Sequence, residues 1–169
     1  MVATLFLAVA GVVSAQSPPA RAIATIGGQS ITVQYSAPSV RGRKIFGAGG
    51  LLSRDPTYPV WRAGANAATT LKTDAALDVG GLMVPAGRYT LYVWVKDPEA
   101  WELIVNKQVG QWGLTYTASA DLGRVKMTMS RPPKPVETLK YTVTDKGGGN
   151  GELRLEWEQH VATVPLHVK

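Results

Sequence analysis

The sequence contains no cysteine among its 169 residues and only two histidines. The absence of thiols excludes a disulfide scaffold, a cysteine-ligated zinc or iron–sulfur site, and cysteine nucleophile chemistry. His160 and His167 lie at opposite parity near the end of the chain, so on a strand they point to opposite faces. A surface or structural role is therefore favoured over metal ligation, and no cofactor is expected.

Common catalytic motifs are also missing. No Gly-x-Ser-x-Gly segment marks a serine hydrolase, and Gly42–Gly47 is followed by alanine rather than by the Lys-Ser/Thr of a phosphate-binding loop. Long apolar runs are absent as well. Val2–Val13 is shorter than the roughly 20 residues that span a bilayer, so we expect no membrane span.

The apolar run at the N-terminus is typical of a secretory leader. Small residues at the ends of Val13-Ser14-Ala15 suit a cleavage site before Gln16. We expect residues 1–15 to be a signal peptide and the protein to be exported to the periplasm or the medium. No Lys or Arg precedes the run, so either the true start lies upstream or the signal is atypical. A buried N-terminal helix is the alternative interpretation.

The pattern after the leader has a period of two. Apolar and polar residues alternate in runs such as Ile31–Tyr35, Val125–Met129 and Leu153–Trp157, which indicates strands with one face inward. Tyr89–Val95 is apolar at both parities, which predicts a central strand. Turns rich in glycine or proline separate the runs.

These features predict the fold class. A hydrophobic fraction of 45% with 18% charged residues favours a packed globular protein over a disordered one. We predict an all-β, single-domain antiparallel β-sandwich of about nine short strands over residues 16–169. Little helix is expected beyond a short segment between Gly49 and Asp55.

The net charge of +6 is unevenly distributed along the chain. Gln16 to Lys72 contains seven basic residues and one acid, Asp55, whereas bases and acids are equal in number from Thr73 to Lys169. A basic protein is a candidate for binding nucleic acid, but export argues against that partner. The local excess instead indicates a defined site for a polar or anionic ligand.

Three predicted loops combine cations or amides with an aromatic residue or glycine. Guanidinium and amide groups donate hydrogen bonds in fixed geometry, and an indole offers a flat face for stacking. Such groups suit a sugar, a small carboxylate-bearing ligand or an anionic polymer. A structural polar network is the alternative, because buried amides and arginines often satisfy loop carbonyls. The candidate ligand-binding residues are Arg43, Lys44, Trp61, Arg62, Asn66, Asn106, Gln111 and Trp112.

The same loops carry a family resemblance. Four ordered blocks, within Val33–Gly47, Val60–Asn66, Pro85–Leu91 and Asn106–Gly113, are similar to the bacterial secreted family called Domain of Unknown Function 2911. The resemblance covers nearly all of the mature chain and implies export, but no established activity. The family commonly has a glutamate where this chain has Ala67, which weakens an enzymatic interpretation.

Two other functions stay open at this stage. An envelope-associated hydrolase needs a carboxylate or histidine within reach of the cluster, and the candidates are Asp121, Glu102 and His160. A structural or interaction module without a small-molecule site would show an exposed apolar patch or an open sheet edge. The sequence does not determine the oligomeric state.

Overall fold

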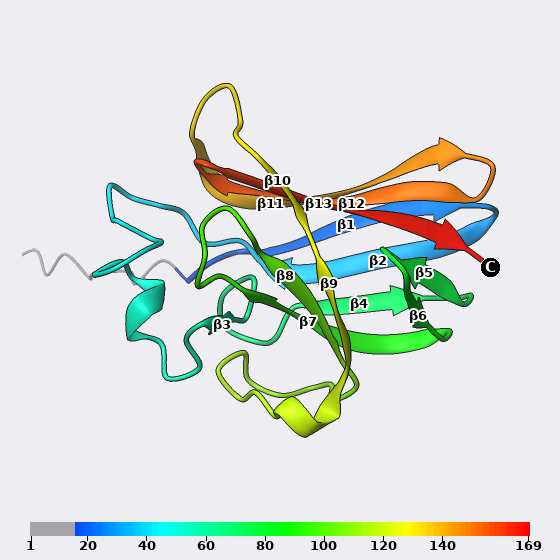
Figure 1. Cartoon of the computed structure of the whole chain (residues 1–169), viewed down its shortest axis with the longest axis horizontal. Coiled ribbons are helices and arrows are strands. Elements are labelled where there is room, and N and C mark those ends of the chain that lie inside the picture. The colour runs from blue at the N-terminus through cyan, green and yellow to red at the C-terminus, as the bar shows by residue number, and fades with distance from the viewer. Residues whose placement is uncertain (1–15) are drawn as a thin grey trace, which may run out of the picture.

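The computed structural model describes residues 16–169, so the predicted signal peptide lies outside the described residues. Two antiparallel sheets pack face to face in this part of the chain (Figure 1). The prediction of an all-β antiparallel sandwich is confirmed. The helical segment considered between Gly49 and Asp55 is a single 3-10 turn, Leu52–Arg54.

The first sheet has the order β1-β2-β4-β7-β8-β9, and β3 also pairs with β7. The second has the order β11-β12-β13-β5-β6, and β10 also pairs with β13. The strands of the first sheet are β1 (Pro19–Ile26), β2 (Gln29–Ser36), β3 (Val60–Trp61), β4 (Thr70–Thr73), β7 (Gly87–Trp94), β8 (Glu102–Asn106) and β9 (Asp121–Lys126). Those of the second are β5 (Leu77–Val79), β6 (Leu82–Val84), β10 (Thr128–Ser130), β11 (Val136–Gly147), β12 (Asn150–Glu158) and β13 (His160–Val168).

The described residues form thirteen strands, not about nine. Four of them, β3, β5, β6 and β10, contain only two or three residues each. Strands this short do not show an alternation of apolar and polar residues, so sequence periodicity misses them. A second 3-10 turn, Ala118–Ala120, precedes β9.

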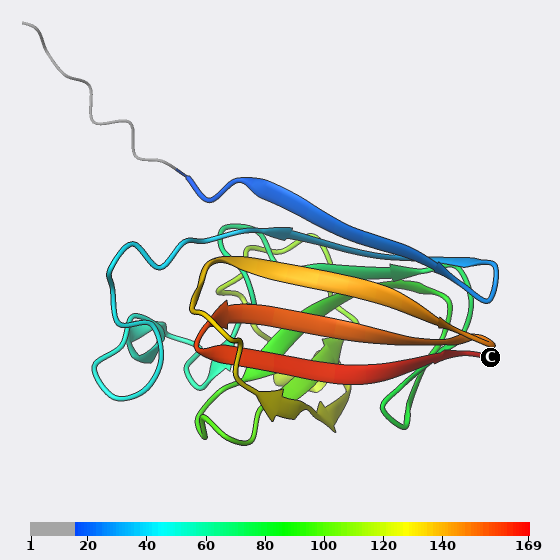
Figure 2. The same ribbon diagram turned by 90° about the horizontal axis from the view of Figure 1, so that it is seen from above.

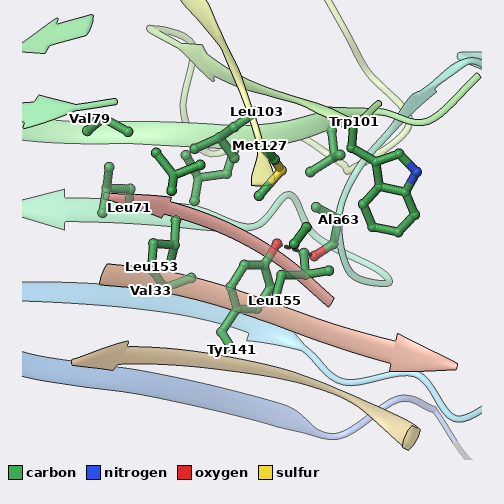
Figure 3. Close-up of a cluster of buried hydrophobic side chains, with 14 of the residues drawn as sticks. Val33, Ala63, Leu71, Val79, Trp101, Leu103, Met127, Tyr141, Leu153 and Leu155 are labelled. Carbon is green, nitrogen blue, oxygen red and sulfur yellow. Dashed lines mark hydrogen bonds between the residues drawn. The ribbon is translucent and has the colours of Figure 1, made fainter. Parts of the chain in front are cut away.

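The alternating residues meet between the sheets as the pattern predicts. Val33, Leu71 and Leu103 of the first sheet gather against Leu153 and Leu155 of the second (Figure 3), and each is at most 2% exposed. Full burial of side chains of this size stabilises a fold by about 1.5–3 kcal/mol each. The hydrophobic effect therefore holds the two layers together.

The central position predicted for Tyr89–Val95 is confirmed, because β7 lies between β4 and β8. Its outer face is covered as well as its inner one. Tyr92 is fully buried there and clusters with Val60 and Ile104, and Tyr116 from the β8–β9 loop packs against them. A strand covered on both faces is apolar at both parities.

Aromatic side chains close one end of the sandwich. The Phe46 ring centroid lies 5.0 Å from that of Trp101 and 5.8 Å from that of Trp157. Trp61 and Trp157 stack at 5.5 Å with an interplanar angle of 17°. Figure 2 shows the β2–β3 loop extending past this end of the second sheet, on the side where β1 begins. The candidate site lies here.

Candidate functional site

A cavity of about 360 Å³ lies at the aromatic end of the sandwich. It is bounded by the segment before β1, the β2–β3 loop, the β3–β4 loop and the end of β12. Four of the eight residues expected in a ligand site lie on its wall: Arg43, Trp61, Arg62 and Asn66. The β2–β3 and β3–β4 loops also hold most of the basic residues of the first third of the chain.

Hydroxyl groups fix the backbone of the β3–β4 loop. The Ala63 carbonyl accepts hydrogen bonds from Thr69 Oγ1 (3.0 Å) and from Tyr141 Oη (2.9 Å), and Figure 3 shows the second contact. Tyr141 belongs to the opposite sheet, and burial raises its pKa well above the ordinary value of 10.0, so the hydroxyl stays protonated and able to donate. Ala63 and Asn66 have φ of 50° and 59°. Strained backbone of this kind persists where surrounding contacts enforce it.

Two glycines let the neighbouring loops approach each other. A Cβ atom at Gly64 would lie 2.6 Å from Thr69 Oγ1, and one at Gly113 would lie 2.5 Å from Arg62 Cδ and 2.8 Å from the Asn66 carbonyl oxygen. Gly113 N also donates to that Asn66 oxygen at 3.0 Å. The Trp-Arg-x-Gly and Gln-Trp-Gly blocks, far apart in sequence, are therefore in direct contact.

Arg43 is held in place by its own loop. Its Nε donates to the Val40 carbonyl (3.0 Å) and its Nη2 to the Ser39 carbonyl (2.6 Å). A guanidinium group has five N–H donors, so these two bonds fix its orientation and leave other donors free. Its positive charge is thus oriented before any ligand arrives.

Two residues of the cavity lining each contain a buried donor that has no hydrogen-bond partner among the described residues. These donors are the indole Nε1 of Trp61, a residue that is only 2% exposed, and the Nε of Arg62. An unpaired buried polar group costs about 1–3 kcal/mol. The side-chain amide of Asn66 is only weakly hydrogen-bonded, because its Nδ2 donates to the Ser17 carbonyl at 3.4 Å.

Asn106 and Gln111 lie elsewhere, in a hydrogen-bond network on the outer side of the first sheet in which Gln111 Oε1 alone lacks a partner among the described residues. The fully buried Asn106 donates to the Thr117 carbonyl (3.0 Å) and to Asp121 Oδ1 (2.8 Å), and its Oδ1 accepts from Gln108 N (2.9 Å). Gln111 Nε2 bonds to Tyr92 Oη (3.1 Å), to Thr90 Oγ1 (3.2 Å) and to the Gln108 carbonyl (3.3 Å). These amides hold the β8–β9 loop on the sheet.

Lys44 and Trp112 are also outside the cavity lining. Lys44 Nζ donates to the carbonyl of Ala48 in its own loop at 2.7 Å. Trp112 is 55% exposed and forms a β-bridge with Ala67. It shares the surface with Ile23, Met83 and Val109 as the exposed large hydrophobic residues of the described chain.

The three candidates for a hydrolytic group do not line the cavity. Asp121 Oδ2 accepts from Tyr116 Oη at 2.6 Å and pairs with Arg124 at 3.4 Å, and Glu102 lies 4.0 Å from the same arginine. Burial and the Asp121 carboxylate both raise the Tyr116 pKa. His160 lines a separate cavity of about 90 Å³, where burial and Arg131 lower its pKa. These residues give no support to hydrolysis at the larger cavity.

Asp55 is on the cavity wall, although sequence reasoning did not include it in the site. It directly follows the 3-10 turn, and its backbone N–H donates to the Leu52 carbonyl. Burial raises the pKa of its carboxyl group, and the positive charge of Arg62 partly opposes this. A signal was available, because Asp55 is the single acid between Gln16 and Lys72.

The fold and the cavity together define a β-sandwich protein with a polar, basic pocket at one end. The chain belongs to the family described as "Protein of unknown function (DUF2911)", whose model matches residues 17–166, and the resemblance in the sequence is confirmed. Neither the curated proteins nor the solved structures contain a match. Ala67 is exposed and does not line this cavity.

The described part of the chain contains neither a cluster of metal-ligating side chains nor a helix that could span a membrane. No group of three or more His, Cys, Asp or Glu side chains between residues 16 and 169 could hold a metal ion. Over the same range no helix has the length and hydrophobicity to cross a membrane.

Proposed function

We propose that this protein is exported and binds a small polar or anionic ligand, sugars and sugar acids included, in the end cavity. The observation that carries the proposal is that two lining residues of one cavity, Trp61 and Arg62, each contain a buried donor without a partner among the described residues, Nε1 and Nε respectively. A ligand oxygen would supply the acceptor that the protein does not, and binding would offset the cost of leaving these groups unpaired.

The charge of the cavity supports an electron-rich ligand. Arg43 and Arg62 contribute two positive charges against the one carboxylate of Asp55 in the lining. Hydrogen bonds from a guanidinium group to an anionic oxygen are about twice as strong as bonds between neutral groups. Asn66 adds an amide, and the stacked Trp61 and Trp157 add an apolar wall.

The size of the cavity favours a small molecule. Sites for small molecules have volumes of about 300–1,000 Å³, and this cavity, at about 360 Å³, is near the lower limit. A monosaccharide or a small organic acid fits this class better than an extended polymer does. Lys44, Asn106, Gln111 and Trp112, which lie off the wall, are not assigned to ligand contact in this proposal.

Export rests on the sequence. The apolar run and the small residues before Gln16 match the pattern of a leader and its cleavage site. The intact mass of protein recovered from the periplasm or medium tests this. We expect a chain that begins at Gln16; a full-length chain retained in the cytoplasm would contradict it.

A thermal-shift screen tests binding. The purified protein is heated with neutral sugars, sugar acids, small carboxylates and anionic polymers. A ligand at a hundred times its Kd stabilises the folded state by about 2.7 kcal/mol and raises the Tm. We expect a shift with at least one small compound, and its loss in Arg62→Met, which keeps the apolar stem beside Gly113.

Lys146→Met is the matched control. It also removes one positive charge, but Lys146 is in β11 of the second sheet, pairs with Glu152 and does not line the cavity. This variant should keep the full shift. The proposal is wrong if no compound changes the Tm, or if the ligand-induced shift in Tm is the same in Arg62→Met as in Lys146→Met.

A further inference from the structure

The cavity contains one carboxylate among its described lining residues, that of Asp55. The negative charge of this carboxylate repels anions, so it does not favour the binding of a purely anionic ligand. Its presence beside Arg43 and Arg62 therefore carries information about the ligand that the basic residues alone do not give.

The backbone of Asp55 is fixed while its carboxylate is free. Asp55 N donates to the Leu52 carbonyl at 3.1 Å, and the Asp55 carbonyl accepts from Tyr58 N at 3.0 Å. The carboxylate forms no hydrogen bond or ion pair with the described residues, although the charge of Arg62 is near enough to influence it. The group is thus positioned by its loop and has no partner of its own.

A partly desolvated carboxylate without donors is unfavourable, as are the unpaired donors of Trp61 and Arg62. The residues that line the cavity therefore include both kinds of group. Arg62, Arg43 and Trp61 offer donors, and Asp55 offers an acceptor with a negative charge.

We infer that the ligand is a small acid that also carries a hydroxyl or ammonium donor, with its acid group at Arg62 and its donor at Asp55. This inference rests on the proposed function and specifies its ligand. A simple carboxylate would leave Asp55 unpaired and be repelled by it, whereas a neutral sugar would leave the charge of Arg62 unneutralised. A hydroxy acid, such as a sugar acid, and an amino acid share the required chemistry.

Isothermal titration calorimetry with four probes tests the inference. D-glucuronate and L-alanine carry both groups, propionate carries only the acid, and D-glucose carries only hydroxyls. Hydrogen bonds to charged groups are roughly twice as strong as those between neutral groups, so at least one of the two bifunctional probes should bind about tenfold or more tightly than propionate and glucose. Whichever of these two probes binds more tightly shows whether the preferred donor is a hydroxyl group, as in D-glucuronate, or an ammonium group, as in L-alanine.

Asp55→Asn should abolish this preference. The affinity of the preferred bifunctional probe should fall toward that of propionate, while propionate itself binds equally or more tightly because its repulsion from Asp55 is gone. Asp74→Asn is the control, because it neutralises an exposed acid paired with Lys72 on the first sheet. It should leave all four affinities unchanged.

The outcomes separate this inference from the proposed function. If propionate binds the wild-type protein as tightly as both bifunctional probes, or if Asp55→Asn keeps the preference, the inference is wrong and the binding site stands. If none of the four probes binds and the broader thermal-shift screen is also negative, the proposed function is wrong and the inference falls with it. If the screen finds only ligands without a donor, the inference alone is wrong.

Discussion

Around Asn106 almost every polar side-chain atom has a partner within the protein, whereas three polar groups of the residues that line the cavity around Arg62 have none among the described residues. Asn106 uses both ends of its amide in bonds of 2.8–3.0 Å, and only Gln111 Oε1 lacks a partner there. On the cavity wall, Trp61 Nε1, Arg62 Nε and the Asp55 carboxylate are all unpaired among the described residues.

The two regions contain similar kinds of residue, so residue type does not distinguish them. What distinguishes the two regions is whether their polar groups have hydrogen-bond partners within the protein. A satisfied network stabilises one conformation of a loop, while unpaired groups in a cavity lower stability and are retained where a ligand completes them. We therefore assign the network to the scaffold and the cavity wall to the proposed site.

The largest expected effect is on the scaffold side. Asn106→Ala removes three hydrogen bonds and leaves the Asp121 carboxylate and the Thr117 carbonyl short of a donor. We expect a loss of about 2–4 kcal/mol in the free energy of unfolding, measured by urea denaturation. Asn66→Gly is the comparison variant, because Asn66 has one long bond and φ of 59°, which glycine adopts freely. It should change stability by less than about 0.5 kcal/mol. Equal losses in the two variants would remove the distinction between the regions.

A smaller effect is expected where the two loops touch. Gly113→Ala places a Cβ atom against Arg62 Cδ and the Asn66 carbonyl, so the Arg62 side chain must move. We expect a cost of about 1–3 kcal/mol together with weaker ligand binding. In an Arg62→Ala background the cost should fall by at least about 0.5 kcal/mol, because the clash with Cδ is absent. If the effects of Gly113→Ala and Arg62→Ala on the free energy of unfolding are strictly additive, the loop contact does not position Arg62.

The smallest expected effect is the pH dependence due to Asp55. Because its pKa is raised in the folded state above the ordinary 3.8, the folded protein binds more protons than the unfolded chain between these two values. Stability therefore falls as the pH rises through that window and stays lower above it. Asp55→Asn should be more stable than the wild-type protein at pH 7, and the difference should vanish below pH 3.8. A variant less stable at pH 7 would show that the carboxylate has a stabilising partner.

The sequence predicted much of the fold because period-two alternation directly records which side chains face the core. Of the eight residues that it predicted for a ligand site, four, namely Arg43, Trp61, Arg62 and Asn66, are on the cavity wall. The separation of these residues from Asn106 and Gln111 depends on which amides find partners across strands, and sequence spacing carries no such information. Asp55 was overlooked because a single carboxylate in a basic segment forms no motif.

The most direct test of the central claim is a ¹H–¹⁵N correlation spectrum of the five tryptophan indole N–H groups, titrated with D-glucuronate and with L-alanine. The account predicts that the Trp61 indole resonance shifts strongly with one of them, because its unpaired N–H gains an acceptor. Trp112, exposed and outside the cavity, should not shift. A Trp61 resonance that stays in place at saturating ligand, or equal shifts of Trp61 and Trp112, would contradict the account.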